Sequence, residues 1–332
     1  MNSFAKGTSL RFNRDMLKQN ILLKEYTNYK IGGPAKYFLE IHSLDDLENG
    51  VREWEFTSQT LEMEARKTYI LGGGTNVLFD DRGFNGLVIY NAISGIERIS
   101  EHEVKFGSGM QFKEALNFAL ETKLSGLEWG GGLPGSVGGA IRGNAGAFGG
   151  EIKDTIVSVE SIDIKTFQKH HRSASECQFG YRSSIFKQLL PDELITSGTF
   201  FFEGRDEVHL KRVVKEHEDY REERQPLDFP SAGSTFKNVP LDQVPLEWQE
   251  KFADQIKNDP FPVMPVAWLL SEAGLKGKQV GGAKISEKHP NFFINTGGAS
   301  SVDLKELLNY AQKNVKEKFN ILIEPEIIIV EY

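Results

Sequence analysis

The chain has 332 residues, of which 39% are hydrophobic and 26% charged, so we expect a soluble globular protein of two or three domains. Its net charge of −8 argues against a protein that coats nucleic acid, and its single cysteine, Cys177, excludes an intrachain disulfide. No stretch approaches the roughly 18 apolar residues of a membrane helix, and "MNSFAKGTSLRFNRDMLKQN" lacks the apolar core of a secretory signal, so we expect a cytoplasmic protein that spans no membrane.

The first segment, residues 1–90, is predicted to contain three strands and one helix. Ser43 is expected to cap the helix, in which Leu44, Leu47 and Val51 share one face. The second strand runs into the glycine turn "LGGGTN". The strands are expected at 35–41, 67–79 and 86–90, and the helix at 43–56.

The second segment, residues 91–218, is predicted to contain short strands, one amphipathic helix at 112–123 and a glycine-rich stretch at 126–150. Strands are expected to resume at 154–164 and 193–203. A polar helix at 206–224 connects this segment to the third, and Pro226 and Pro230 end it.

The third segment, residues 219–332, is predicted to contain two better helices. The first, at 266–275, ends near Gly277, and the second, at 301–319, is capped by Ser300 or Ser301. Strands at 291–295 and 321–332 flank the second helix, which indicates an α+β or βαβ unit.

The sequence "GGGLPG" at 130–135 matches the dinucleotide fingerprint G-x-G-x-x-G, but we reject a Rossmann interpretation. That motif must follow a strand and open a helix, whereas here a helix precedes it and Pro134 falls inside it. The glycine-rich "SVGGAIRGNAGAFGGE" that follows is predicted not to form a stable helix.

Two glycine clusters, 71–76 and 133–146, have backbones that few side chains obstruct. Such backbones offer exposed N–H groups and allow a pyrophosphate to approach closely, so two of them could hold one dinucleotide. Tight corners and bulges of a barrel would use the same residues. Spacing alone does not separate the two interpretations.

Seven stretches, in one order across about 300 residues, resemble the UDP-N-acetylenolpyruvoylglucosamine reductases of bacterial cell-wall synthesis, the MurB family. They are "NYKIGGPAKYF", "YILGGGTNVLF", "LPGSVGGAIRGNAGAFGGEI", "FGYRSSIFK", "RQPLDFPSAGSTFKN", "EAGLKGKQVGGAKISEKHPNFFINTGGAS" and "EPEIIIVE". The short run from "IFK" to "TSGTFFFE" is similar to the family form that lacks an extra substrate-covering loop.

This resemblance implies an α+β fold, with an FAD-binding module of the vanillyl-alcohol-oxidase type made of two subdomains (1–90 and 91–218) and a C-terminal α+β substrate-binding domain (219–332). It implies non-covalent FAD, NADPH as reductant, no metal and a monomer. The implied FAD-binding residues are Tyr29, Lys30, Ile31, Gly72, Gly73, Gly74, Thr75, Asn76, Pro134, Gly135, Ser136, Val137, Gly138, Gly139 and Asn144.

The implied reaction reduces the enolpyruvyl ether of UDP-N-acetylglucosamine to UDP-N-acetylmuramate. Hydride addition to this double bond builds negative charge toward the carboxylate, so the protein must stabilise an enolate and deliver a proton. By resemblance, Arg182 holds the carboxylate, Glu326 lies against it as a protonated donor or as an orienting group, and Ser234 donates the proton. A nucleophilic role for Ser234 is disfavoured, because "AGSTF" does not match G-x-S-x-G.

The same match implies that five residues bind the substrate nucleotide: Tyr181, Arg224, Lys237, Asn238 and His289. Cys177 is expected to be a buried, inert thiol. The chain departs from the family at 239–265, where Trp248, Phe252 and Ile256 would share one face of an extra helix beside the substrate mouth.

Two other functions are consistent with the sequence. A flavin oxidase or dehydrogenase of the same fold would act on another small substrate. A nucleotide-sugar-binding or regulatory protein would bind without turnover, but the joint presence of Arg182, Ser234 and Glu326 argues against it.

Overall fold

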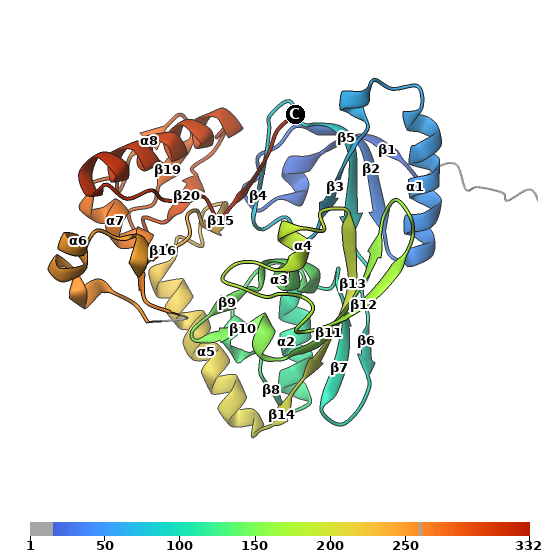
Figure 1. Ribbon diagram of the computed structural model, residues 1–332, viewed down its shortest axis with the longest axis horizontal. Helices are drawn as coiled ribbons and strands as arrows, with labels where there is room; N and C mark the ends of the chain where they lie inside the picture. The colour runs from blue at the N-terminus through green and yellow to red at the C-terminus, as the bar shows by residue number, and fades with distance from the viewer. Residues whose placement is uncertain (1–15, 259–260) are drawn as a thin grey trace, which may run out of the picture.

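A computed structural model describes residues 16–258 and 261–332 of the chain. Most of the N-terminal stretch 1–20, which is predicted not to be a secretory signal, lies outside these residues. Figure 1 shows α1 and the first sheet at one side of the molecule, α7 and α8 at the other, and the connecting helix α5 (Glu207–Arg224) between them. No helix in the described ranges has both the length and the apolar character needed to span a bilayer.

The first segment is built on a four-stranded sheet in the order β1-β2-β5-β3, with β2, β5 and β3 parallel. Helix α1 (Leu44–Ser58) packs on this sheet and buries Leu47, Val51 and Trp54, and the Ser43 hydroxyl accepts from the Asp46 N–H at 3.1 Å. The predicted cap and helix are confirmed. The strands are β1 (Lys18–Leu22), β2 (Pro34–Ile41), β3 (Lys67–Leu71) and β5 (Phe84–Asn91).

The second segment is built on a five-stranded antiparallel sheet in the order β12-β11-β13-β7-β6. Helices α2 (Phe112–Glu121) and α3 (Val137–Gly143) share its core with the buried rings of Phe106, Phe200 and Phe202. The strands are β6 (Ile96–Arg98), β7 (Glu103–Gly107), β11 (Ile156–Asp163), β12 (Lys169–Ser173) and β13 (Glu193–Phe201). Shorter elements are β8 (Leu124–Ser125), β9 (Gly146–Ala147), β10 (Gly150–Glu151), α4 (Ile185–Gln188) and β14 (Glu203–Gly204).

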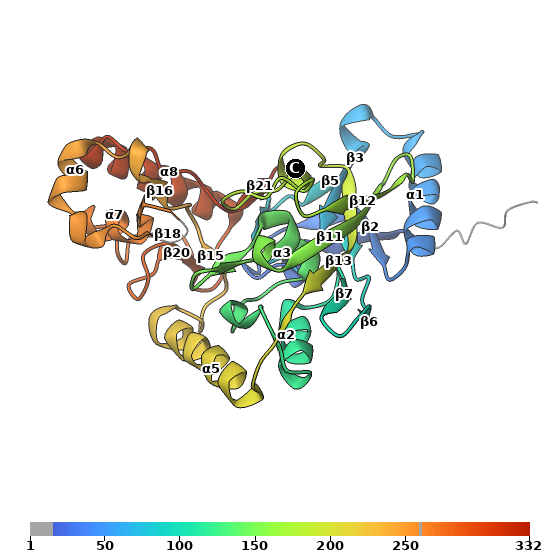
Figure 2. The ribbon, with the colours of Figure 1, turned by 60° about the horizontal axis from the view of Figure 1, so that its bottom comes forward.

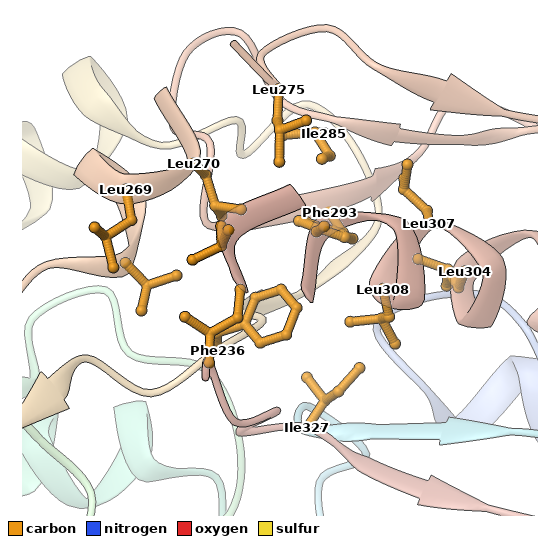
Figure 3. Close-up of a cluster of buried hydrophobic side chains, with 14 of the residues drawn as sticks. Phe236, Leu269, Leu270, Leu275, Ile285, Phe293, Leu304, Leu307, Leu308 and Ile327 are labelled. Carbon is orange, nitrogen blue, oxygen red and sulfur yellow. The ribbon is translucent and has the colours of Figure 1, made fainter. Parts of the chain in front are cut away.

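The third segment packs helices α7 (Val266–Glu272) and α8 (Ser301–Phe319) against the antiparallel sheet β15-β20-β19-β18. Figure 3 shows Leu304, Leu307 and Leu308 of α8 in this core with Phe236 and Phe293. Ser300 caps α8 as expected, with its hydroxyl accepting from the Asp303 N–H at 3.0 Å. The strands are β15 (Ser231–Ser234), β18 (Gln279–Val280), β19 (Ala283–Ile285) and β20 (Phe292–Asn295).

The predicted glycine-rich loop after Ser136 contains a helix, so the expectation that no helix forms there is wrong. The Ser136 hydroxyl caps α3, Asn144 ends it in a left-handed conformation (φ 42°), and Val137 and Ile141 are buried. Tertiary burial therefore outweighs the low helix propensity of glycine. The element before "GGGLPG" is a 3-10 helix (Glu128–Gly130) and no strand, which agrees with the rejection of a Rossmann site.

The predicted strand 321–332 does not complete a βαβ unit with 291–295. Only β21 (Ile328–Val330) is a strand, and it pairs in parallel with β4 (Val77–Phe79) of the first segment. Val330 belongs to the core of that first segment. The chain therefore returns to its first segment at the end, which a local pattern cannot reveal.

The extra segment 239–265 does not form one continuous helix. Helix α6 (Leu246–Lys251) ends before Phe252, and a 3-10 turn (Ala253–Gln255) follows. Trp248 and Phe252 still pack together, with ring centroids 5.5 Å apart. Residues 259–260 of this segment lie outside the described residues. Strands β16 (Val239–Pro240) and β17 (Val263–Met264) pair at its base.

The third segment is attached to the first by hydrogen bonds at the start of α8. The Asp81 carboxylate accepts from the Ser301 N–H at 2.7 Å and from the Ser301 hydroxyl at 2.8 Å. Lys305, one turn along, forms an ion pair with Asp80 at 3.3 Å. The Asn295 side chain donates to the Tyr29 carbonyl at 3.0 Å.

We predict that Asp81→Ala lowers the free energy of unfolding by about 1 kcal/mol, because the first turn of α8 loses an acceptor for its N–H groups. The measurement is the midpoint of urea unfolding followed by tryptophan fluorescence, to which Trp248 and Trp268 of the third segment contribute. Glu306→Ala on the exposed face of the same helix is the control and should leave the midpoint unchanged. Equal midpoints for the two variants would contradict the attachment.

Candidate active site

A cleft of about 1020 Å³ is lined by residues from all three segments. Its volume lies at the upper end of the roughly 300–1,000 Å³ typical of small-molecule sites, so it can hold a large ligand or two smaller ones. In Figures 1 and 2, helix α3, which contributes to its wall, lies near the middle of the molecule.

One wall of the cleft consists of the two glycine-rich loops, which touch each other. The Ser136 hydroxyl accepts from the Gly73 N–H at 3.2 Å and from the Gly139 N–H at 3.3 Å, so one side chain joins both loops. A Cβ at Gly73 would lie 2.8 Å from the Gly135 Cα, and one at Gly135 would lie 2.8 Å from the Thr75 Oγ1. Glycine is therefore required for the loops to meet and present bare backbone to the cleft.

This wall fits a dinucleotide such as FAD, since it offers backbone and neutral donors with few side chains in the way. Eleven of the predicted FAD-binding residues line the cleft: Lys30, Gly72, Gly73, Gly74, Thr75, Asn76, Pro134, Gly135, Ser136, Gly138 and Gly139. The other four, Tyr29, Ile31, Val137 and Asn144, are buried behind it.

Asn144 supports the wall from behind. Its side-chain amide donates to Glu151 at 2.5 Å and to the Gly180 carbonyl at 3.0 Å, and its side-chain oxygen accepts from the Lys153 N–H at 3.0 Å. These contacts join α3 to the loop that carries Tyr181 and Arg182.

The three predicted catalytic side chains, Arg182, Ser234 and Glu326, line the same cleft. Arg182 Nε lies 3.1 Å from Glu326 Oε1, and Arg182 Nη2 donates to the Gly146 carbonyl at 2.7 Å. Both side chains of this ion pair are partly exposed to the cleft, by 25% and 18%. A carboxylate entering the cleft could therefore reach the arginine.

The backbone places Ser234 close to Glu326. The Glu326 N–H donates to the carbonyl of Thr235, the residue after Ser234, at 2.8 Å, and Phe236 bridges to Pro325. Gly233 has φ +73°, and a Cβ there would meet no atom within 4 Å, so the approach to Ser234 is open. Within the described residues, the Ser234 hydroxyl has no hydrogen-bond partner.

Burial raises the pKa of Glu326, and the nearby charges of Arg182, Lys187 and Lys237 oppose the rise. A carboxyl with a raised pKa can hold its proton at higher pH and donate a hydrogen bond, as an enolate stabiliser must. The raised pKa is the feature that favours a neutral Glu326, whereas the contact with Arg182 favours its charged form.

Four of the five predicted substrate-binding residues line one of two pockets. Tyr181 and Asn238 line the main cleft. Lys237 lines neither pocket, and its Nζ forms an ion pair with Glu324 at 3.2 Å. Arg224 and His289 line a smaller pocket of about 340 Å³, which shares Gln225 with the cleft. Burial lowers the pKa of His289 to about 4, so its imidazole is neutral at pH 7.

Three cleft-lining cations, Arg142, Lys187 and Arg221, were not among the predicted site residues. Arg142 lies in "GAIRGNAG" and Lys187 ends "YRSSIFK", so both stood inside recognised motifs. These cations could have been sought in the sequence, because an acidic protein that binds anionic nucleotides needs local positive charge. Cys177 is buried, and burial raises the pKa of its thiol to about 11, as expected for an inert thiol.

Comparison with known proteins agrees with this geometry. Residues 225–330 match the family described as the C-terminal domain of UDP-N-acetylenolpyruvoylglucosamine reductase, and residues 56–166 match the family described as an FAD binding domain. The expected fold, an FAD-binding module of the vanillyl-alcohol-oxidase type with a C-terminal α+β domain, is confirmed.

Curated relatives match over almost the whole chain. The UDP-N-acetylenolpyruvoylglucosamine reductase of Caldanaerobacter subterraneus subsp. tengcongensis is 36% identical, with 96% of each chain covered. That of Carboxydothermus hydrogenoformans is 37% identical, with 93% of each covered. The crystal structure of the enzyme from Thermus caldophilus matches with a TM-score of 0.71 and 27% identity, covering 94% of this chain and 99% of that one. The chain belongs to the UDP-N-acetylenolpyruvoylglucosamine reductase family.

Proposed function

We propose that the cleft binds FAD and UDP-N-acetylglucosamine enolpyruvate side by side, and that Arg182, Ser234 and Glu326 carry out the protein's part of an NADPH-dependent reduction to UDP-N-acetylmuramate. The observation that carries this proposal is that the three side chains and the paired glycine loops line one cleft. Bound FAD, once reduced by NADPH, supplies the hydride. The enzyme is thus a flavin-dependent oxidoreductase of peptidoglycan precursor synthesis.

Arg182 is suited to hold the substrate carboxylate, because a guanidinium can make two parallel hydrogen bonds to it. Its position is held by the Gly146 carbonyl and by Glu326. Lys187 donates to the Arg182 carbonyl at 2.8 Å and adds a second positive charge nearby. This positive potential stabilises the enolate that hydride addition creates.

Ser234 is suited to deliver the proton to the alpha carbon. A serine hydroxyl is a weak acid, so it can act only when it is already aimed and the carbanion is strongly basic. The antiparallel contact between residues 235–237 and 324–326 fixes Ser234 beside Glu326. That contact supports Glu326 as the group that returns a proton to the serine.

Tyr181, Lys237 and Asn238 are proposed to bind the substrate nucleotide, with Arg224 and His289 extending the site into the smaller pocket. We further propose that residues 1–90 and 91–218 form the FAD-binding module and 219–332 the substrate-binding domain. The protein would act as a cytoplasmic monomer, without nucleic acid or membrane partners.

Ser234→Ala should slow the enolpyruvyl half-reaction by roughly 10²–10⁴-fold, because the proton donor is lost. Reduction of the bound flavin by NADPH should be nearly unaffected. Stopped-flow absorbance measures both half-reactions. Ser231→Ala, at another cleft-lining serine of the same strand, is the control and should leave both rates near wild type. An equal fall of both half-reactions in Ser234→Ala would remove Ser234 from the proton-donor role.

The rate of substrate reduction should fall at high pH, because Glu326 loses its proton as the pH rises through its raised pKa. Glu326→Gln keeps a neutral hydrogen-bond donor that does not titrate but cannot return a proton to Ser234, so its turnover should be lower while the alkaline decline is absent from its pH profile. Glu324→Gln, two residues away and exposed, should retain it. A decline that persists unchanged in Glu326→Gln would show that another group titrates.

Gly139→Ala should lower the affinity for FAD by at least about tenfold, because the added methyl faces the cleft where the ligand must approach. The folded protein should tolerate it, since the new Cβ would meet only the Ser136 hydroxyl, at 3.3 Å. Titration of apoprotein with FAD, followed by flavin fluorescence, measures the affinity. Gly204→Ala, where no atom lies within 4 Å and which is outside the cleft, is the control. Unchanged affinity in Gly139→Ala would place FAD elsewhere.

A further inference from the structure

Five cationic side chains line the cleft, and one of them differs from the rest. Four donate to protein acceptors: Lys30 to the Glu25 carbonyl, Arg182 to Gly146 and Glu326, Lys187 to the Arg182 carbonyl, and Arg221 to the Gly131 carbonyl. The guanidinium of Arg142 donates to no group in residues 16–258 and 261–332.

The fold fixes the backbone from which this guanidinium extends. Arg142 lies in the last turn of α3, between the buried Ile141 and the left-handed Asn144. Its own carbonyl accepts from the Ser184 hydroxyl at 2.7 Å. Burial lowers the pKa of Arg142, which means that the surroundings disfavour its charge. The Arg142 side chain is half-buried at the wall of the cleft, so an anion bound there would supply the partner that the protein does not.

A second unpartnered donor lies beside it. Tyr69, on β3, lines the cleft, and its hydroxyl makes no hydrogen bond within the described part of the chain. Burial raises the pKa of Tyr69 to about 12, while the charge of Arg142 opposes the rise. Both side chains line the same cleft, and Tyr69 keeps its proton at pH 7 as a neutral donor.

The two donors come from the elements that carry the two glycine loops. Tyr69 precedes Gly72 by three residues on the strand that enters the first loop, and Arg142 follows Gly139 by three residues on the helix that begins in the second. Arg182, which is proposed to hold the enolpyruvyl carboxylate, contacts Gly146 and Glu326, whereas Arg142 contacts neither. We therefore consider a different anionic group for Arg142.

We propose that Arg142 and Tyr69 bind the diphosphate of FAD, as the charged part of a cradle that otherwise consists of backbone and neutral donors. The inference rests on the proposed FAD site. A diphosphate supplies the anionic acceptor that the Arg142 guanidinium does not find in the protein. The Tyr69 hydroxyl can donate one further, neutral hydrogen bond to it.

The test measures FAD, FMN and riboflavin binding to apoprotein by fluorescence titration, together with the thermal unfolding of the apoprotein. Arg142→Met should weaken FAD binding about 10- to 100-fold, the loss of a charge-assisted hydrogen bond, and leave riboflavin binding unchanged. Arg142→Lys should recover part of the loss. Tyr69→Phe should weaken FAD binding about three- to tenfold. Apo Arg142→Met should unfold at the same or a higher temperature, because an unpaired charge has been removed.

Three results would overturn the inference. Wild-type affinity for FAD in Arg142→Met, with a raised KM for the nucleotide substrate, would assign Arg142 to the substrate. An equal loss of riboflavin and FAD binding would show that Arg142 shapes the pocket without contacting phosphate. A lower unfolding temperature of apo Arg142→Met would assign it a structural role. Wild-type protein that binds no flavin would instead refute the proposed function itself.

Discussion

The return of the C-terminal strand to the first segment is the constraint on which the site depends. Pairing of β21 with β4 places Glu326 where the Asn76 side chain donates to its carbonyl at 3.2 Å and the Thr235 carbonyl accepts from its N–H. One residue is thus held by the glycine loop of the first segment and by the serine strand of the third. Arg182, from the second segment, completes the arrangement through its ion pair. Without the pairing of β21 with β4, Glu326 would not be held beside Ser234 and Arg182.

Cations slightly outnumber carboxyl groups in the cleft, although the chain as a whole is acidic. The chain carries a net charge of −8, whereas five cations and four carboxyl groups line the cleft, and the pKa of one of these carboxyl groups, Glu326, is raised. FAD, NADPH and the UDP-linked substrate of the family's reaction are all anionic nucleotides, so positive charge must be held near them in an otherwise acidic protein. The protein does so by tethering most of these cations to backbone carbonyls, which neutralise no charge and fix position.

Much of the fold and site could be predicted from the sequence, because local rules determine them. The apolar faces of α1 and α8, their serine caps and the ordered motifs all depend on residues close in the chain. Helix α3 could not be predicted, since its glycines form a helix only when Val137 and Ile141 are buried by other segments. The same holds for β21, whose partner strand lies some 250 residues away. It also holds for the absence of an acceptor near the Arg142 guanidinium, because that depends on every segment that packs around it.

Arg182 also has a left-handed backbone, with φ +52°. An arginine in that conformation is disfavoured by roughly 1–2 kcal/mol relative to a residue without a Cβ, so the backbone conformation by itself would favour glycine there. The Arg182 side chain in turn contacts the Gly146 carbonyl and Glu326. A library randomised at this position and sorted for heat resistance alone would therefore weigh relief of backbone strain against loss of the contacts with Gly146 and Glu326, with no regard to turnover.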